Sequence, residues 1–293
     1  MTAPVLADPL GPRALRRARV ASLIAGALIA LLLFIAYRRL SSNGQFEWRL
    51  WEPFTQWAVL KFLLLGFAAT AKAAALGMAI AMLLGAGLAL LRLSLTAPLR
   101  WFAAAWVEFF RGFPLLLLIF FSFFVLPDYG IDMTPFKALV LALSLYNGAM
   151  LGEIFRAGIL SLDRGQSEAA YAVGLTYWQT MFLVVIPQAA RRMLPSIISQ
   201  MVTLLKDTSL GFVISYEELL RRSRSSGEFF KNPLQTTLFV ALIYIAVNYS
   251  LGRVAQWLEA RQRRRYGASS IGGAGGEDLA VVSAVAAVTD RDA

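Results

Sequence analysis

The chain has 293 residues, of which 58% are hydrophobic, with a mean hydropathy of +0.62 and a formal net charge of +10. This composition is too apolar for an ordinary soluble domain and indicates a protein of the lipid bilayer. Lys and Arg accumulate in the cytoplasmic loops of membrane proteins, so the positive charge does not call for nucleic acid as a partner. The absence of cysteine and histidine excludes disulfides, thiol nucleophiles, imidazole bases and the usual zinc sites. We therefore expect a non-catalytic all-α membrane protein that binds no metal or other cofactor.

Six apolar segments approach the roughly 20 residues that a helix needs to cross a hydrocarbon core of about 30 Å. They lie at residues 20–37, 60–91, 103–126, 136–155, 195–215 and 236–258. A cleaved signal peptide is an alternative for the first segment, but Arg38-Arg39-Leu-Ser-Ser offers no clear small-residue cleavage site. We expect the first segment to be retained, which gives six spans.

Arginines predict the orientation of these spans. Arg13, Arg16, Arg17 and Arg19 precede the first one, which places residues 1–19 in the cytoplasm. Six spans then bring the other terminus to the same side, so that 20–265 form the transmembrane domain. Residues 266–293, rich in Gly, Ala and Ser, are expected to be a flexible cytoplasmic tail.

The second and third segments each carry a packing or bending signal. In the second, small residues recur every four positions and predict close helix packing: Ala69, Ala73, Gly77, Ala81, Gly85 and Ala89. In the third, Pro114 predicts a kink or a break near the membrane surface. Glu108 and Arg111, three residues apart, form either a gating pair or a purely structural one.

The fourth segment ends in a polar set, and a polar stretch follows it. Tyr146, Asn147 and Glu153 suit either interhelical hydrogen bonding or substrate contact, and Glu153 is three residues from Arg156. The polar stretch at 165–187 predicts two short helices joined by a tight turn. In it, Ser167 is expected to cap the first helix and Gly174 to end it in a left-handed conformation.

The second of these short helices has its own signals. Thr176 and Gln179 have capping-box spacing, and Pro187 is expected to follow the end of the helix. Tyr171, Trp178 and Phe182 supply aromatic anchors, of which Trp178 and Phe182 are expected to point back toward the membrane helices. The unit is suited to lying in a groove of a partner.

The fifth segment carries polar residues at a depth where they are costly unless they face a cavity, a partner or one another. These are Lys206, Asp207, Thr208 and Ser209, and Gly211 is expected to permit irregular backbone beside a cavity. The segment is either part of a solute pathway or an intramolecular polar clamp that bends the helix.

The stretch at 165–187 resembles the EAA signature of bacterial ABC-importer permeases. Glu168-Ala169-Ala170, three residues, Gly174, nine residues and Val184-Val185-Ile186-Pro187 match a consensus of EAA, three residues, Gly, nine residues and Ile-x-Leu-Pro, with two apolar replacements. Three flanking segments are similar to polar amino-acid uptake permeases, for glutamate, aspartate, glutamine, histidine and arginine among others. They are Glu108–Pro114, Glu153–Ile159 followed by Gly165-Gln166, and Lys206–Leu210, and the likeness runs from about residue 57 to 258.

This resemblance implies the type I ABC-importer permease fold, with five core transmembrane helices and the first segment as a peripheral sixth. It implies that Glu168, Ala169, Ala170, Gly174 and Pro187 couple the permease to an ATPase, and that both termini are cytoplasmic in a bacterial inner membrane. The chain contains no Gly-x-x-x-x-Gly-Lys-[Ser/Thr] loop, so ATP and Mg²⁺ would act on a separate chain. The implied partners are an ABC ATPase homodimer, a second permease that is identical or a paralogue, and an extracytoplasmic solute-binding protein.

Two other function classes remain open on sequence grounds. An ion-gradient-driven secondary transporter could use the polar segment as its coupling site, although paired broken helices are not evident. An intramembrane hydrolase would have to use Lys206 with Ser209, because no histidine is present. Among amino-acid substrates, Lys206 and the outer arginines slightly favour glutamate.

Overall fold

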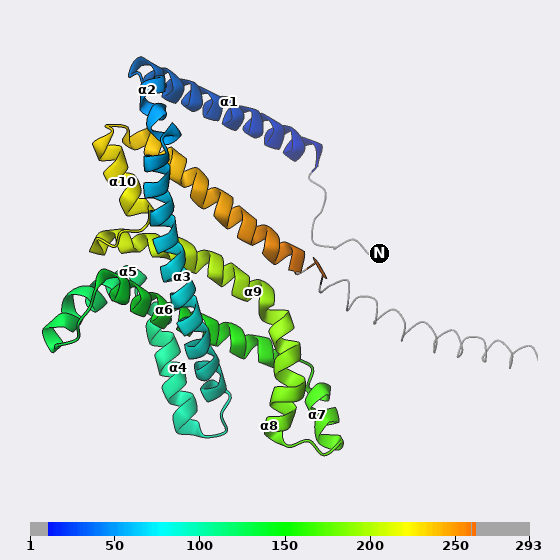
Figure 1. Cartoon of the computed structure of the whole chain (residues 1–293). Helices are drawn as coiled ribbons and strands as arrows, with labels where there is room; N and C mark the ends of the chain where they lie inside the picture. The colour runs from blue at the N-terminus through cyan, green and yellow to red at the C-terminus, as the bar shows by residue number, and fades with distance from the viewer. Residues whose placement is uncertain (1–10, 259, 262–293) are drawn as a thin grey trace, which may run out of the picture.

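The computed structural model describes residues 11–258 and 260–261, and every regular element in that part of the chain is a helix (Figure 1). This confirms the all-α expectation. The α-helices, 3₁₀-helices (η1, η3, η5) and π-helices (η2, η4) are, in chain order, α1 Pro12–Ser42, α2 Trp48–Trp51, η1 Glu52–Thr55, α3 Trp57–Arg92, α4 Ala97–Gly112, α5 Leu115–Phe120, η2 Phe121–Val125, η3 Leu126–Tyr129, α6 Pro135–Leu160, α7 Arg164–Ala172, α8 Tyr177–Thr180, η4 Met181–Val185, α9 Ile186–Asp207, η5 Thr208–Ile214 and α10 Leu219–Phe229. A further helix, Pro233–Leu258, closes the described bundle. We call the end near α10 the upper end and the end near α7 and α8 the lower end, as drawn in Figure 1.

The centre of the bundle is the contact between α3 and α6, where the row of small residues on α3 packs as expected. Ala73, Ala81 and Ala89 of that row are at most 1% exposed. At Gly85 a methyl group would lie 2.8 Å from Cβ of Leu151 and 2.9 Å from the amide nitrogen of Gly152. The two backbones therefore approach so closely that only small side chains fit between them. α9, α5 and η5 complete this core with Leu204, Ile119 and Ile214, among others.

The break expected at Pro114 in the third segment, residues 103–126, is present. α4 ends at Gly112, α5 begins at Leu115, and the two helices are bent by 100° at the break. Phe113 has an extended backbone, with φ −83° and ψ 129°, as expected for the residue before a proline. Of the kink and the break expected at Pro114, the structure therefore contains the break, in the middle of the segment.

The second short helix, α8, ends at Thr180 and therefore before Pro187, as expected, but helical backbone continues past the proline. From Tyr177 to Ile214 the chain forms one candidate span of 38 residues, built from α8, η4, α9 and η5. The wide π-helical turn at Met181–Val185 lies directly before Pro187, which occupies the first turn of α9. A proline is tolerated there because the amide that it lacks has no partner in an ordinary first turn.

Within the described residues, five helices are long and apolar enough to cross a membrane, and the bent α4–α5 pair raises the number to six. This agrees with the six expected spans. The apolar stretch of α1 is 0% buried, and Figure 1 shows α1 projecting from the upper end, which fits a peripheral helix. The proposed tail at 266–293 and the first ten residues lie outside the described residues, so the expected domain boundaries stay predictions.

We predict that Gly85→Ala destabilises the permease, because its methyl group would meet backbone atoms of α6 that cannot move independently. The expected loss is about 1–3 kcal/mol, measured by thermal unfolding of the purified protein in detergent. Gly87→Ala is the control: a methyl group at this position on α3 would have open space around it, so higher helix propensity should make that variant neutral or more stable by up to about 1 kcal/mol. Equal melting temperatures for both variants would contradict the packing account.

Candidate functional site

The stretch at 165–187 forms two helices joined by a turn, and we call Arg164–Thr180 the α7–α8 hairpin. Asp163, not Ser167, caps α7: its Oδ1 accepts the amide of Gly165 at 2.8 Å. The Ser167 cap is therefore a wrong expectation, because the helix begins earlier at a residue that caps equally well. Ser167 lies inside α7 instead.

The turn and the start of α8 follow the sequence prediction. Gly174 has φ +85°, a left-handed conformation that suits a residue without Cβ. Thr176 Oγ1 accepts the amide of Gln179, and Gln179 Oε1 accepts the amide of Thr176 at 2.9 Å, which completes the capping box. These local bonds hold the hairpin in one shape.

The hairpin presents an exposed surface with apolar and aromatic side chains. Glu168 and Ala169 are exposed, whereas Ala170 is buried against the rest of the chain. Trp178 and Phe182 are 57% and 55% exposed, and their rings stack with centroids 5.9 Å apart. Both rings are more than half exposed, so they do not pack against the membrane helices of this chain as expected. Such a surface is typical of a docking site.

Two hydrogen bonds attach the hairpin region to α9. Arg192 Nη1 donates to the carbonyl oxygen of Ser161 at 2.7 Å, and Gln188 Nε2 donates to Gln166 Oε1 at 3.1 Å. Both bonds join residues more than 20 positions apart in sequence. The start of α9 is thus tied both to the end of α6 and to α7.

Beside the hairpin, a lower ion cluster joins α3 to α6. Glu153 pairs with Arg156, whose Nε lies 3.2 Å from the carboxylate, and also with Arg92 at the end of α3. All three side chains are at most 29% exposed. Sequence spacing identified the Glu153–Arg156 pair, but Arg92 lies 61 positions from Glu153 and had no local signal. In the Glu108–Arg111 pair, Arg111 Nη1 lies 3.7 Å from Glu108 Oε1, and both side chains are more exposed than those of the cluster.

The polar stretch Lys206–Ser209 lies where α9 passes into the 3₁₀-helix η5. Thr208 is fully buried and donates to the carbonyl oxygen of Leu205 at 2.6 Å, whereas Lys206 is exposed and Asp207 and Ser209 are half-buried. Gly211 was expected to lie beside a cavity, but it does not. A methyl group at this position would lie 2.7 Å from Cδ2 of Leu139 in α6. The stretch thus presents part of its polar surface outward and anchors the rest.

Asn147 of the fourth segment forms an interhelical bond. It is fully buried, and its Oδ1 accepts a hydrogen bond from Gln200 Nε2 of α9 at 2.7 Å. Of the two alternatives for this residue, interhelical hydrogen bonding is therefore the one that the structure contains.

At the upper end lies a buried carboxylate that the sequence did not single out. Glu218 is 0% exposed and caps α10, accepting the amides of Leu220 at 2.8 Å and Arg221 at 2.6 Å. Tyr244, in the helix Pro233–Leu258, donates its hydroxyl to Glu218 at 3.1 Å. Thr70 of α3 accepts the amide of Leu219 at 3.1 Å. We call Thr70, Glu218 and Tyr244 the upper polar node, because they join three helices.

The electrostatics of this node follow from its burial. Burial raises the pKa of Glu218 above its ordinary value, and the two amide hydrogen bonds and that of Tyr244 partly oppose this. Tyr216 lies nearby and donates to the carbonyl oxygen of Ala69 at 2.9 Å. Burial first, and the charge of Glu218 second, raise the pKa of Tyr216, so its hydroxyl keeps the proton that it donates.

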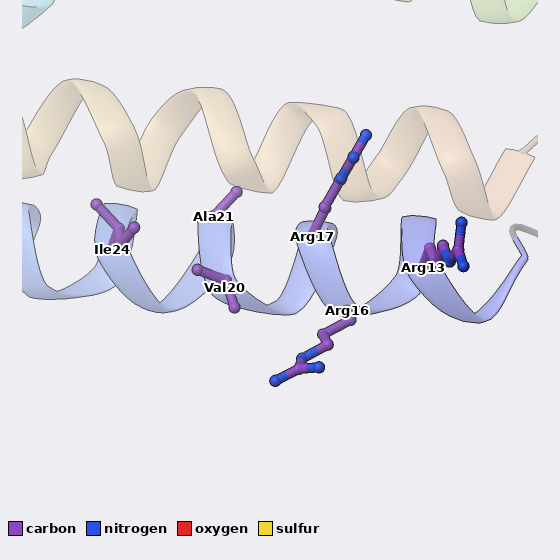
Figure 2. A pocket seen from close by; sticks show the side chains of 6 residues that line it. All are labelled: Arg13, Arg16, Arg17, Val20, Ala21 and Ile24. Carbon is purple, nitrogen blue, oxygen red and sulfur yellow. The ribbon is translucent and has the colours of Figure 1, made fainter.

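A hollow of about 430 Å³ lies beside the first turns of α1, far along the chain from these groups (Figure 2). Its lining includes Arg13, Arg16, Arg17, Val20, Ala21 and Ile24, and Figure 2 shows Arg16 and Arg17 pointing to opposite sides of the helix. Arginines next to an apolar helical stretch are typical of a membrane boundary. We therefore assign this hollow to the lipid surface and not to the functional site.

Comparison with protein families matches residues 77–264 to the family described as "Binding-protein-dependent transport system inner membrane component". Similar curated proteins include the glutamate transport system permease protein GluD of Corynebacterium glutamicum, which is 40% identical over 76% of this chain and 84% of its own length. The probable glutamine ABC transporter permease protein GlnP of Bacillus subtilis is 43% identical over 69% and 94%. The glutamate/aspartate import permease protein GltK of Escherichia coli O157:H7 is 35% identical over 74% and 98%.

Two similar solved structures agree with these matches. A crystal structure of an amino acid ABC transporter with histidines has a TM-score of 0.65 and 29% identity, covering 69% of this chain and 94% of the other. The methionine transporter MetNI in an inward-facing conformation has a TM-score of 0.54 at 18% identity, covering 69% and 96%, which bears on the fold alone.

We predict that Glu218→Ala destabilises the upper end. The change removes the cap of α10, which costs about 0.5–2 kcal/mol, and leaves the Tyr244 hydroxyl without this acceptor, which adds about 1–3 kcal/mol. Thermal unfolding in detergent measures the loss, and Glu217→Ala, at an exposed position, is the control.

The raised pKa of Glu218 also predicts that the stability of the protein depends on pH. Because the folded state raises the pKa of Glu218, the folded state binds a proton more tightly than the unfolded state does. The contribution of Glu218 to stability should therefore fall as the pH rises from the unfolded value through the folded one. A pH profile of the melting temperature that is identical in Glu218→Ala and in the original protein would contradict this assignment.

Proposed function

This chain belongs to the family of binding-protein-dependent transport system inner membrane components, and from that premise we propose how it works as the transmembrane subunit of an amino-acid ABC importer. A separate ATPase homodimer hydrolyses ATP with Mg²⁺, a second permease chain completes the path, and an extracytoplasmic solute-binding protein delivers the amino acid. The lack of a phosphate-binding loop in this sequence supports the placement of ATP on another chain. Nothing in the relatives supports a secondary transporter.

The observation that carries the coupling proposal is the α7–α8 hairpin. Glu168 and Ala169 of α7 are exposed, Trp178 of α8 is exposed and stacks on Phe182 just after the hairpin, and Ala170 packs inward. Gly174 gives the hairpin its fixed turn. A small rigid unit with an exposed apolar side suits a groove of the ATPase, because little entropy is lost when it docks.

We place the lower end in the cytoplasm of a bacterium, beneath its inner membrane, with both termini on that side. Arg92, Arg156 and Arg192 lie at this end, and positive charge favours the cytoplasmic side. Pro187, at the start of α9, belongs to the coupling surface because it lies where the hairpin enters the membrane helix. In this orientation the upper end of the bundle faces the solute-binding protein.

The Lys206–Ser209 stretch is proposed to line the translocation path. Lys206 is exposed and the carboxylate of Asp207 is half-buried, so both can meet water or solute when the paired permeases change their packing. The Glu108–Arg111 pair and the lower ion cluster are proposed as structural or gating contacts near the path. Substrate selection toward glutamate is supported by relatives at 40% and 35% identity that are named for glutamate.

We predict that Ala169→Trp uncouples transport. Ala169 is exposed, so the larger side chain leaves the permease folded, but it should hold the ATPase groove away from the hairpin. Co-purification of the ATPase and ATP-driven amino-acid uptake into proteoliposomes should both fall by roughly tenfold or more, the effect of losing about 1.4 kcal/mol of docking energy. Gly174→Val should act similarly, since its left-handed backbone disfavours a β-branched residue.

Leu95→Trp is the control for bulk, because Leu95 is 88% exposed and lies between α3 and α4, outside the hairpin. Wild-type docking and uptake in both Ala169→Trp and Gly174→Val would remove the hairpin from the coupling surface.

A further inference from the structure

Lys72 is an isolated charge in the second span. Between Phe62 and Leu91 it is the only charged residue of α3. At a rise of 1.5 Å per residue it lies about 22 Å from the first residue of the helix and about 30 Å from the last. A charged side chain so far from both ends of an apolar helix is costly unless it meets water, an opposite charge or a ligand.

Three elements converge at this lysine. Its ammonium lies 4.9 Å from the ring centroid of Phe136, in the first turn of α6. The Phe136 ring in turn lies 5.9 Å from the ring of Tyr216, whose hydroxyl donates to the carbonyl oxygen of Ala69, three residues before Lys72 on α3. The cation is therefore placed against the Phe136 ring of α6, which in turn packs against Tyr216 in the segment after η5.

The charge of Lys72 has no carboxylate partner within this part of the chain. Among the described residues, no Asp or Glu oxygen lies within 4.0 Å of its ammonium, although other basic residues such as Arg92, Lys137 and Arg224 do form such pairs. A cation–π contact leaves the positive charge in place. Because Lys72 is also exposed, its ammonium can accept an anionic ligand from outside the chain.

We propose that Lys72 is a substrate-binding residue that takes the side-chain carboxylate of an acidic amino acid during its passage. This inference rests on the proposed function, because the ligand proposed for the exposed ammonium of Lys72 is the transported amino acid. η5, which begins at Thr208, leads within a few residues to Tyr216, so the proposed path stretch and the lysine belong to one connected region. Phe136 and Tyr216 limit the positions that the ammonium can take, which favours one bound geometry.

The alternative is a purely structural role, in which Lys72 only joins α3 to α6 through its contact with Phe136. Substitutions can separate the effect of the charge from the effect of this contact. Lys72→Met removes the charge, Lys72→Arg keeps it, and Phe136→Leu keeps the charge but removes the aromatic contact. Lys61→Met is the matched control, because Lys61 is an exposed lysine three turns earlier on the same helix.

The experiment measures binding of radiolabelled L-glutamate and L-glutamine to the permease–ATPase complex in nanodiscs, without the binding protein. The two probes have nearly the same shape and differ in side-chain charge. Lys72→Met should weaken glutamate binding at least about tenfold and change glutamine binding less than about twofold, the size expected when a hydrogen bond between two charged groups is lost. Lys72→Arg should stay within about threefold of the original for both probes, and Lys61→Met should match the original.

Three results would overturn the assignment: equal weakening of both probes in Lys72→Met, the same selective loss in Lys61→Met, or no measurable glutamate binding by the original complex. ATP-driven uptake by the original complex in proteoliposomes is measured in parallel. Loss of that activity would contradict the proposed function itself, whereas normal uptake with unselective binding would contradict only the role of Lys72.

Discussion

The close contact of α3 with α6 is the constraint on which the other features depend. Small residues at Ala73, Ala81 and Gly85 let the two backbones approach, and no larger side chain fits at Gly85 without moving α6. In a bilayer, where lipid is as apolar as the core, such packing supplies much of what holds helices together. The pair carries polar groups at both ends: Thr70 joins the upper polar node, and Arg92 meets Glu153 at the lower end.

The polar groups at the two ends of the bundle therefore hold different helices together. At the lower end, the ion cluster fixes the ends of α3 and α6, and the bond from Arg192 to Ser161 ties the start of α9 to the same place. At the upper end, Glu218 caps α10 and receives Tyr244, so that α10 is held by two neighbouring helices. Between them α9 runs from the hairpin to η5. We propose that a displacement of the hairpin is passed along α9 toward the proposed path.

Features that depend on local sequence could be predicted, and features that depend on tertiary contacts could not. Gly174 and the Thr176–Gln179 capping box follow from spacing alone, and the helices form as those residues dictate. The Ser167 cap was wrong because Asp163 lies earlier and caps the same helix. The break at Pro114 could be predicted because a proline restricts the residue before it, but the 100° bend between α4 and α5 could not be predicted from hydropathy, which averages over many residues. Glu218 gave no signal, since its burial depends on Tyr244, 26 positions away.

The central claim is that a displacement of the hairpin reaches the membrane helices through α9, whose start is held against the end of α6, and Arg192→Met tests that connection most directly. This variant keeps the apolar stem of the side chain but removes the donor to the Ser161 carbonyl oxygen. The measurement is the number of amino-acid molecules taken up per ATP hydrolysed by the reconstituted importer in proteoliposomes. The account predicts that ATPase co-purification and hydrolysis stay near the original level while uptake per ATP falls several-fold. An unchanged ratio of uptake to hydrolysis would contradict it.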